Sequence, residues 1–380
     1  MSISKRAEEI TPFIVMDVLE RAKELERQGK NIIHLEVGEP DFDTPRVATE
    51  AGISAIRRGE THYTHSQGLI ELREAVAEDY HSKYGVSVNP ARVIITSGTS
   101  PAMLLIFGAM LETGEEVILP NPYYSCYPNF VKFVGGVPVC VNIYEDDGFT
   151  YRPQEIKKKL SQATKAIMLN SPSNPTGCII GIKEMEDVAA MGRLIISDEI
   201  YHGLVYEGKE HSILEVTDNA FVVNGFSKLY AMTGWRLGYV IAPERFLRPM
   251  QKLQQNLFIS ASAFAQWAGI AALRDAGEDV KKMVETLNTR RKFMISKLRE
   301  LGFGITVEPT GAFYVFANAK KFTSDSYRFA FDILDKAGVA VTPGIDFGSN
   351  GEGYIRFSYS NSIENIGEGM ERIKKYLSAI

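Results

Sequence analysis

The segment KAIMLNSPSNPTGCIIGIKEMEDVAAMGRLIISDEIY, residues 165–201, decides the fold. It begins with a continuously apolar run (165–169), continues through an amphipathic stretch (182–191) and returns to a second apolar run (193–197). Short, continuously apolar runs are typical of strands that are covered on both faces, and such strands occur mainly in parallel sheets. The segment therefore predicts two parallel strands joined by a crossover helix that packs on the sheet.

The same alternation of apolar runs and helical patterns extends to both sides of this segment. Helical patterns at 68–80 and 101–111 separate some of the runs. Repetition of strand, crossover and strand predicts an α/β fold, in which a large lobe holds a mostly parallel sheet between helices. The further predicted strands are 92–96, 116–119, 138–143, 221–224 and 237–241.

The sequence changes character after about residue 285. A charged helical pattern (284–301) leads to short strand-like runs (311–317 and 353–358). The chain then ends in a helix whose apolar residues recur every three or four positions, which predicts one buried stripe. We expect a smaller α+β lobe built from both chain ends. The predicted domains are 1–45 (N-terminal arm and part of the small domain), 46–285 (large domain) and 286–380 (small domain).

Composition excludes several classes of protein. The 380 residues carry a formal charge of −5, so the chain lacks the basic character of a nucleic-acid-binding protein. Three scattered cysteines (Cys126, Cys140 and Cys178) form neither a disulfide framework nor a zinc motif. No apolar stretch has the length of a signal peptide or a bilayer span, which favours a cytoplasmic protein.

Polar residues follow the predicted strands directly, at the edge of a parallel sheet where ligands bind. Ser-Gly-Thr-Ser at 97–100 precedes a helix and offers free N–H groups to an anion, although a simple N-cap turn has the same sequence. Asn174 lies in a rigid turn, and Asp198 ends a buried strand, where a structural ion pair is an equal alternative.

A lysine and an arginine follow the strand at 221–224. Most lysines face solvent, but a buried Lys228 would lose its proton readily and attack carbonyls. Arg236, eight residues later, suits a phosphate. An anion-binding turn, an amide, an acid, the phenol of Tyr201, a lysine and an arginine together match an aldehyde cofactor that carries a phosphate and a pyridine nitrogen. That cofactor is pyridoxal 5'-phosphate.

The whole chain resembles the class I aminotransferases, pyridoxal-phosphate enzymes of the aspartate aminotransferase fold (fold type I). The matching motifs occur in the family's order along the chain, and an ordered set is far more specific than any single motif. They are GEPDFDTP (38–45), HYTHSQGLIELREA (62–75), SGTS (97–100), NPYYSCYP (121–128), NSPSNPTG (170–177), SDEIYHGLVY (197–206), GFSKLYAMTGWRLGY (225–239), PTGAFYVF (309–316) and YIRFSYS (354–360).

The resemblance implies catalytic and cofactor-binding roles. Lys228 would form the Schiff base with the cofactor and then move the proton between substrate and cofactor carbons. Asp198 would keep the pyridine nitrogen protonated, while Tyr201 and Asn174 would hydrogen-bond the ring oxygen. The implied contacts to the phosphate end of the cofactor are Gly98, Thr99, Ser100, Ser227 and Arg236.

Three further roles follow from the resemblance. Tyr124 would stack on the cofactor ring, although core packing is its ordinary alternative. Tyr63 would reach the phosphate of a neighbouring subunit, which implies a homodimer with shared active sites; its alternative is a loop tyrosine. Arg356 would bind the substrate α-carboxylate through a bidentate fork, assisted by Asn174 and the Gly38 backbone, unless it forms a surface ion pair.

The sequence departs from the family pattern at Gly225, three residues before Lys228. Many relatives have a serine there that contacts the phosphate, and Ser227 does not occupy the same position. We therefore expect phosphate binding to depend more strongly on Arg236 and on the backbone of the 97–100 turn.

The substrate is predicted from the residues expected near the pocket. Relatives specific for dicarboxylates carry a second cation, but the turn at Ser100-Pro101 and the segment 257–263 have none. This pattern predicts a neutral or aromatic amino donor with 2-oxoglutarate as acceptor. The aromatic residues that support this prediction are Phe42, Tyr63, Tyr124 and Phe347.

Other activities stay open on the same scaffold. An aspartate aminotransferase and a pyridoxal phosphate-dependent C–S β-lyase share the cofactor and its chemistry. A non-enzymatic ligand sensor is a remote alternative, because about forty residues before the large lobe are too few for a DNA-binding domain and the net charge is negative.

Overall fold

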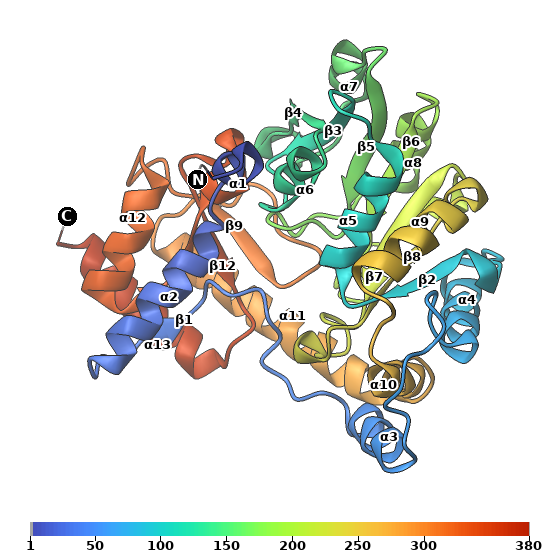
Figure 1. Ribbon diagram of the computed structural model, residues 1–380. Coiled ribbons are helices and arrows are strands. Elements are labelled where there is room, and N and C mark those ends of the chain that lie inside the picture. The colour runs from blue at the N-terminus through green and yellow to red at the C-terminus, as the bar shows by residue number, and fades with distance from the viewer. Residues whose placement is uncertain (1–2, 380) are drawn as a thin grey trace.

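The computed structural model describes residues 3–379, which form two lobes (Figure 1). The middle of the chain builds the large lobe, coloured from cyan to yellow in the figure. The N-terminal and C-terminal segments, blue and red, lie side by side in the small lobe. The predicted small lobe made from both chain ends is confirmed.

A seven-stranded sheet forms the centre of the large lobe, in the order β2-β8-β7-β6-β5-β3-β4. Strand β8 is antiparallel to both neighbours, and the other pairs are parallel, which confirms a mostly parallel sheet. Each of the seven strands lies within two residues of its predicted bounds. The strands are β2 (Val93–Thr96), β3 (Glu116–Asn121), β4 (Val137–Asn142), β5 (Thr164–Asn170), β6 (Leu194–Asp198), β7 (Ala220–Gly225) and β8 (Gly238–Ile241).

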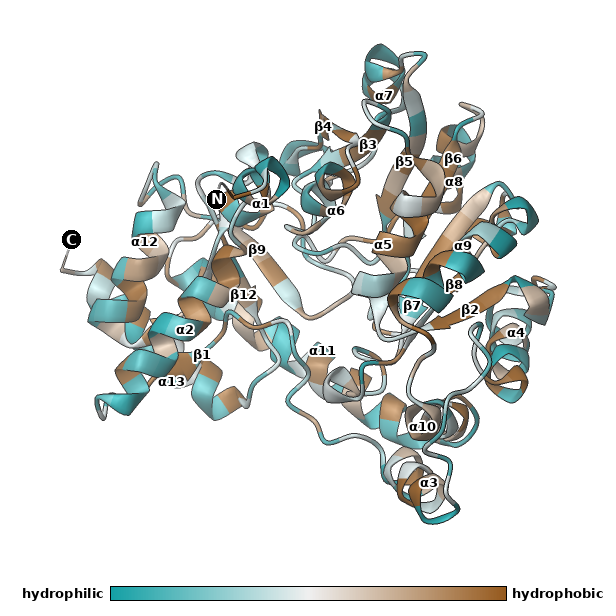
Figure 2. Cartoon of the chain, viewed as in Figure 1, coloured by the Kyte–Doolittle hydropathy of each residue, from teal (hydrophilic) through white to brown (hydrophobic). Residues whose placement is uncertain are grey.

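Helices cover both faces of this sheet, and neighbouring residues of one strand enter different cores. Ile94 and Ile196 belong to one core, shared with α5 (Thr99–Met110), α6 (Tyr127–Phe133) and α9 (Glu244–Leu257). Ile95 and Ile195 belong to the other, shared with α4 (Ile70–Tyr84), α7 (Pro153–Lys159), α8 (Ile182–Ala189) and α10 (Ala263–Asp275). Because most of the sheet is buried on both faces, the strands are largely apolar, as Figure 2 shows by their brown colour, whereas the edge strand β4 is partly exposed. The helices of this lobe are α3 (Arg46–Arg57), α4 (Ile70–Tyr84), α5 (Thr99–Met110), α6 (Tyr127–Phe133), α7 (Pro153–Lys159), α8 (Ile182–Ala189), α9 (Glu244–Leu257) and α10 (Ala263–Asp275).

The small lobe holds two short sheets. An antiparallel sheet has the order β11-β12-β9, and β1 of the N-terminal arm pairs in parallel with β10. The predicted strand at 311–317 starts later, at Tyr314, because Gly311 forms an isolated bridge to Val205 and residues 312–313 form a turn. The elements are β1 (Ile33–His34), β9 (Tyr314–Asn318), β10 (Val339–Ala340), β11 (Thr342–Pro343), β12 (Tyr354–Ser358), α1 (Lys5–Glu9), α2 (Ile14–Arg27), α11 (Gly277–Glu300), α12 (Ser326–Asp332) and α13 (Ile363–Leu377).

The predicted domain boundaries fall at two different kinds of place. The boundary at 45/46 coincides with the start of α3, whereas the one at 285/286 lies inside the continuous helix α11. The division into domains therefore stays a prediction.

Within residues 3–379, no helix combines the length and the apolar character needed to cross a bilayer. This part of the chain also holds no group of three or more histidine, cysteine or acidic side chains placed to bind a metal ion. Cys126, Cys140 and Cys178 are free thiols.

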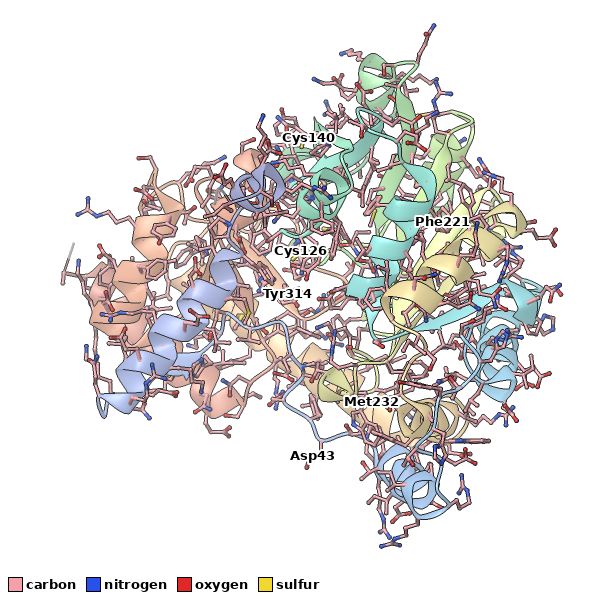
Figure 3. The ribbon with its side chains drawn as sticks, in the orientation of Figure 1. Asp43, Cys126, Cys140, Phe221, Met232 and Tyr314 are labelled. Carbon is pink, nitrogen blue, oxygen red and sulfur yellow. The ribbon has the colours of Figure 1, made fainter. Side chains whose placement is uncertain are left out.

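We expect the core between the sheet and α9 to carry much of the stability of the large lobe. Phe221 of β7, labelled in Figure 3, is fully buried and its ring centroid lies 4.9 Å from that of Phe246 on α9. Phe221→Ala should cost about 3–5 kcal/mol and lower the midpoint of urea unfolding. The control Phe133→Ala, at a side chain 46% exposed, should cost less than about 1 kcal/mol. Equal shifts in the two variants would contradict this assignment of the core.

Candidate active site

A pocket of about 240 Å³ lies where the carboxyl ends of β5, β6 and β7 face the small lobe. Tyr314, which lines this pocket and is labelled near the middle of Figure 3, marks the position of the pocket between the two lobes. Eleven predicted site residues line the pocket, namely Gly38, Thr99, Ser100, Tyr124, Asn174, Asp198, Tyr201, Ser227, Lys228, Arg236 and Arg356.

One end of the pocket is suited to an anion. Gly98 precedes α5 with a φ of +98°, and a Cβ atom there would lie 2.7 Å from Nη2 of Arg236. The guanidinium of Arg236 also donates a hydrogen bond to the Thr233 carbonyl oxygen at 3.0 Å. A cation therefore lies beside the free N–H groups at the start of a twelve-residue helix, whose dipole is positive at this end.

Asp198 ends β6 with only 5% of its surface exposed. Burial raises the pKa of this carboxyl to about 6, although hydrogen bonds from Tyr127 and Ile200 oppose the rise. The Tyr127 hydroxyl donates to Oδ2 at 2.6 Å, and the Ile200 N–H donates to Oδ1 at 3.2 Å. Both donors are neutral groups, so the carboxylate keeps its charge available for a cationic ligand.

Lys228 follows β7 and reaches into the pocket, where its Nζ donates a hydrogen bond to the Gly38 carbonyl oxygen at 2.6 Å. Burial lowers the pKa of this amine to about 8. Glu39 opposes the shift, while the positive charges of Arg356 and Arg236 add to it. An amine with a pKa near 8 is partly neutral at physiological pH and can act as a nucleophile or base.

The structure explains why glycine occupies position 225. A Cβ atom on Gly225 would lie 3.0 Å from the Cα of Gly238 and 3.0 Å from the Leu237 carbonyl oxygen. Both contacts are with backbone of the neighbouring antiparallel strand, which cannot move as a side chain would. A serine at this position would therefore require the backbone of the two strands to move apart by a few tenths of an ångström.

Arg356 lies on the small lobe side of the pocket and is 2% exposed. Its guanidinium carbon lies 4.3 Å from the ring centroid of Tyr314 and 4.9 Å from that of Phe347. Nη1 donates to Asn174 Oδ1 at 2.9 Å, and Nη2 donates to the Glu36 carbonyl oxygen at 2.5 Å. These acceptors are uncharged, so the buried positive charge is free to meet a carboxylate.

Aromatic side chains complete the walls of the pocket. The hydroxyls of Tyr201 and Tyr314 are 2.8 Å apart, and both side chains are almost completely buried. Tyr124 packs edge-on against Tyr127 and Phe13, with ring centroids 5.3 and 5.9 Å away. These contacts fix the ring of Tyr124 beside the opening of the site.

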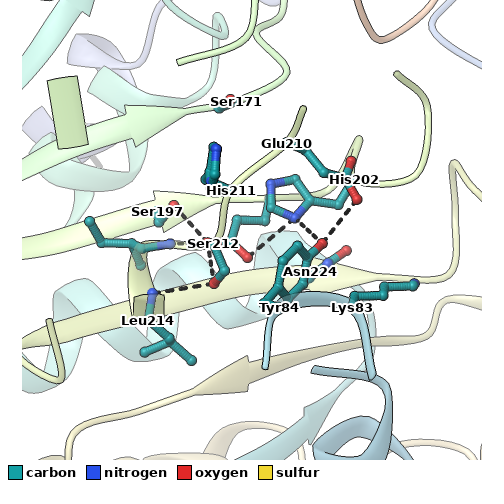
Figure 4. A network of polar contacts seen from close by, with 12 residues as sticks. Lys83, Tyr84, Ser171, Ser197, His202, Glu210, His211, Ser212, Leu214 and Asn224 are labelled. Atoms are coloured by element: carbon teal, nitrogen blue, oxygen red, sulfur yellow. Dashed lines mark hydrogen bonds and ion pairs between the residues drawn. The ribbon is translucent and has the colours of Figure 1, made fainter. Parts of the chain in front are cut away.

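A buried polar network supports the strand end from behind. Glu199 accepts hydrogen bonds from the hydroxyls of Tyr80 (2.9 Å), Ser197 (3.1 Å) and Ser212 (3.0 Å). Figure 4 shows part of this network, in which the Tyr84 hydroxyl contacts His202. Since Glu199 directly follows Asp198, the network holds the end of β6 and thereby the position of the Asp198 carboxylate.

Some predicted residues lie outside the pocket lining. Tyr63 is 80% exposed. Gly98 does not line the pocket itself but lies directly against the guanidinium of Arg236, which does. Of the other aromatic residues expected near the substrate, Phe42 packs against Arg290 beside a separate groove, and Phe347 lies behind Arg356. Tyr124 alone of those four lines the pocket as described.

Sequence reasoning missed several lining residues. Tyr127 and Tyr314 lie within motifs already recognised, NPYYSCYP and PTGAFYVF, but received no role. Phe13, Val15 and Met16 come from the N-terminal arm, whose sequence carries no motif that signals a pocket. Only the three-dimensional path of the arm brings them to the site.

Comparison with known proteins agrees with this geometry. Residues 30–373 match the family described as aminotransferase class I and II. The chain is 43% identical to (5-formylfuran-3-yl)methyl phosphate transaminase of Methanocaldococcus jannaschii, over 99% of this chain and 100% of the relative. It is 40% identical to the aspartate aminotransferase of Pyrococcus horikoshii, over 96% and 94%.

A solved structure has the same fold. The aspartate aminotransferase of Thermus thermophilus with maleate superposes with a TM-score of 0.95 at 37% identity, over 99% of each chain. The family inferred from the motif order is thus confirmed over nearly the whole length. This chain belongs to the class I and II aminotransferases and is an aminotransferase.

Proposed function

We propose that this aminotransferase uses pyridoxal phosphate, held on Lys228, to move an amino group from a neutral or aromatic amino acid to 2-oxoglutarate. One observation carries the proposal. A single pocket joins a low-pKa lysine, a buried carboxylate, a cationic anion cradle and an arginine without a charged partner. These groups match the aldehyde, the pyridine nitrogen, the phosphate and the substrate carboxylate in turn.

The residues present fit the cofactor. Because Gly98 has no Cβ atom, the guanidinium of Arg236 can approach the start of α5 closely, and the two together suit a bound phosphate. Asp198 has neutral partners only and suits a protonated pyridine nitrogen. When bound, pyridoxal phosphate supplies an aldehyde for the amine and a ring that withdraws electrons from the substrate carbon.

The protein's own groups orient the substrate and handle its proton. Arg356 binds the α-carboxylate through its fork, with Asn174 already hydrogen-bonded to it. The amine of Lys228 would accept the proton from the substrate Cα and return it to the carbon that was the aldehyde carbon of the cofactor. Tyr201 and Asn174 donate hydrogen bonds to the ring oxygen of the cofactor, and the ring of Tyr124 covers its face.

The walls of the pocket support a neutral or aromatic donor. Phe13, Val15 and Met16 add apolar surface beside Tyr124. Among the described residues that line the pocket, the cations are Lys228, Arg236 and Arg356, and each already has a partner in the proposal. A second carboxylate would therefore meet no further cation within this subunit.

Aspartate is the second candidate donor, and one finding favours it. The Pyrococcus horikoshii relative is named an aspartate aminotransferase and matches this chain nearly end to end.

The proposal includes a homodimer in the cytoplasm. Tyr63 is 80% exposed, and large apolar side chains are also exposed on α3 (Ile53 and Ile56) and at the end of α9 (Leu257). Exposed apolar surface of this kind suits contact with another protein. In the proposed dimer, Tyr63 of each subunit contacts the phosphate in the other.

Colour tests the attachment of the cofactor. The purified protein with pyridoxal phosphate should absorb visible light and lose that band on borohydride reduction. Lys228→Ala should lack the band, because Lys228 is the one lysine among the described residues that line the pocket. The control Lys165→Ala, at a lysine paired with Glu115 on the surface, should keep it. A wild-type protein that stays colourless would contradict the mechanism.

The pH dependence of cofactor attachment follows from the lysine pKa. Because only the neutral amine attacks an aldehyde, the attachment rate in cofactor-free protein should rise with pH and level off above about 8. Stopped-flow absorbance between pH 6 and 10.5 measures this rate. A rate that keeps rising to pH 10.5 would show that the amine has the ordinary pKa of lysine.

A donor panel tests the substrate class. With 2-oxoglutarate as acceptor, kcat/KM for phenylalanine and tyrosine should exceed that for aspartate by at least ~10-fold, because a second carboxylate would be desolvated without a partner. Alanine and leucine provide intermediate cases. If aspartate is the best donor, the neutral-donor proposal is wrong and the second candidate holds.

A further inference from the structure

We propose that Tyr314 is a positioning residue that links the two halves of the active site. Its hydroxyl sets the hydrogen-bond direction of Tyr201 on the cofactor side. Its ring holds the plane of Arg356 on the substrate side. Tyr314 is the first residue of β9 and is 1% exposed, so both contacts lie at a buried position on a strand. The inference rests on the proposed function, because it takes Tyr201 to contact the cofactor.

The first contact joins two phenols. The oxygen atoms of Tyr314 and Tyr201 are 2.8 Å apart, and either hydroxyl can donate when no ligand is considered. Once Tyr201 donates its proton to the ring oxygen of a cofactor, its own oxygen can only accept from Tyr314. A phenol that accepts a hydrogen bond becomes a stronger donor, since chains of hydrogen bonds polarise one another.

The second contact is with the carboxylate-binding arginine. The guanidinium carbon of Arg356 lies 4.3 Å from the Tyr314 ring centroid, within the range of a cation–π interaction. Phe347 covers the opposite face at 4.9 Å. The two rings restrict the guanidinium to one plane, which is the geometry that a bidentate carboxylate needs.

A third contact explains why position 38 is glycine. A Cβ atom on Gly38 would collide with the Tyr314 hydroxyl oxygen and would lie 3.2 Å from its Cζ. Without the hydroxyl, the Cζ contact is tight but needs a shift of only a few tenths of an ångström. The carbonyl of Gly38 accepts the hydrogen bond from Lys228, so the Tyr314 hydroxyl and the lysine share one wall of the site.

The first experiment separates hydroxyl from ring. In protein loaded with pyridoxal phosphate, Tyr314→Phe should raise the pH midpoint of the visible band by on the order of half a unit, because Tyr201 becomes a weaker donor to the ring oxygen. The same variant keeps the ring, so inhibition by 3-phenylpropanoate, a carboxylic acid without an amine, should stay within about twofold. Tyr314→Leu should shift the pH midpoint of the visible band and should also weaken the binding of 3-phenylpropanoate by roughly 3- to 10-fold.

A matched control removes another buried phenol. Tyr359 is fully buried, and its hydroxyl donates to the Ala312 carbonyl oxygen at 3.2 Å. Tyr359→Phe should leave both the spectral midpoint and the inhibitor affinity as in the wild type. A general effect of deleting a buried hydroxyl would instead appear in both variants and would overturn the inference.

The second experiment uses the collision at position 38. Gly38→Ala alone should lower kcat/KM by on the order of 100-fold, because the new methyl group displaces the Tyr314 hydroxyl and shifts the residue 38 carbonyl that contacts Lys228. The double variant Gly38→Ala with Tyr314→Phe should recover at least ~10-fold of that loss, since the colliding oxygen is gone. If the loss of kcat/KM in the double variant equals the product of the losses in the two single variants, the proposed contact between positions 38 and 314 is overturned. Circular dichroism and thermal melting check that each variant is folded.

The outcomes keep two failures apart. A wild-type protein that forms no visible band refutes the cofactor proposal itself. A wild-type band that titrates, together with a Tyr314→Phe midpoint within 0.1 unit of it, refutes the role of Tyr314 alone.

Discussion

A buried positive charge with only neutral partners is the constraint on which the site depends. Burial of Arg356 would be costly on its own, because ions lose their hydration in the interior. An amide oxygen, a carbonyl oxygen, a hydroxyl and two aromatic rings reduce that cost without cancelling the charge. The position is also rigid, since β12 is the middle strand of its sheet, paired with β9 and β11. In the function that we propose, a substrate carboxylate would supply the negative charge that Arg356 does not receive from the protein.

The same principle governs the large lobe. Asp198 meets neutral donors, and Lys228 meets a backbone carbonyl, so neither charge is cancelled by a salt bridge to the other. Buried charges without a charged partner lower the stability of the ligand-free protein. A ligand of opposite charge that pairs with them stabilises the protein, and this gain strengthens its binding. The antiparallel strand β8 belongs to this arrangement, because its backbone lies so close to Gly225 that a Cβ atom there would have to displace it by a few tenths of an ångström.

Much of the fold was predictable, because strands that are buried on both faces of a sheet appear in the sequence as short apolar runs. The strands of the large sheet are mainly apolar, and the polar groups stand at their last residues or directly after them. The direction of β8 was not predictable, since apolar runs have no sense of direction. Phe13 and Met16 were missed for a different reason: a wall formed by a distant arm depends on tertiary path and not on local pattern. Tyr314 was visible as part of a motif, but its contact with Gly38 requires coordinates.

The pairing of the two chain ends has a consequence for how the protein folds during its synthesis on the ribosome. The Glu36 carbonyl and Arg356 meet across 320 positions of sequence, and β1 pairs with β10. The central sheet is complete once Ile241 has been made, well before these partners emerge. We therefore expect a nascent chain to build its large lobe first and to carry its N-terminal arm unpaired until synthesis is nearly finished. A chain that lacks residue 356 also lacks one wall of the pocket, so the complete pocket requires nearly the whole sequence.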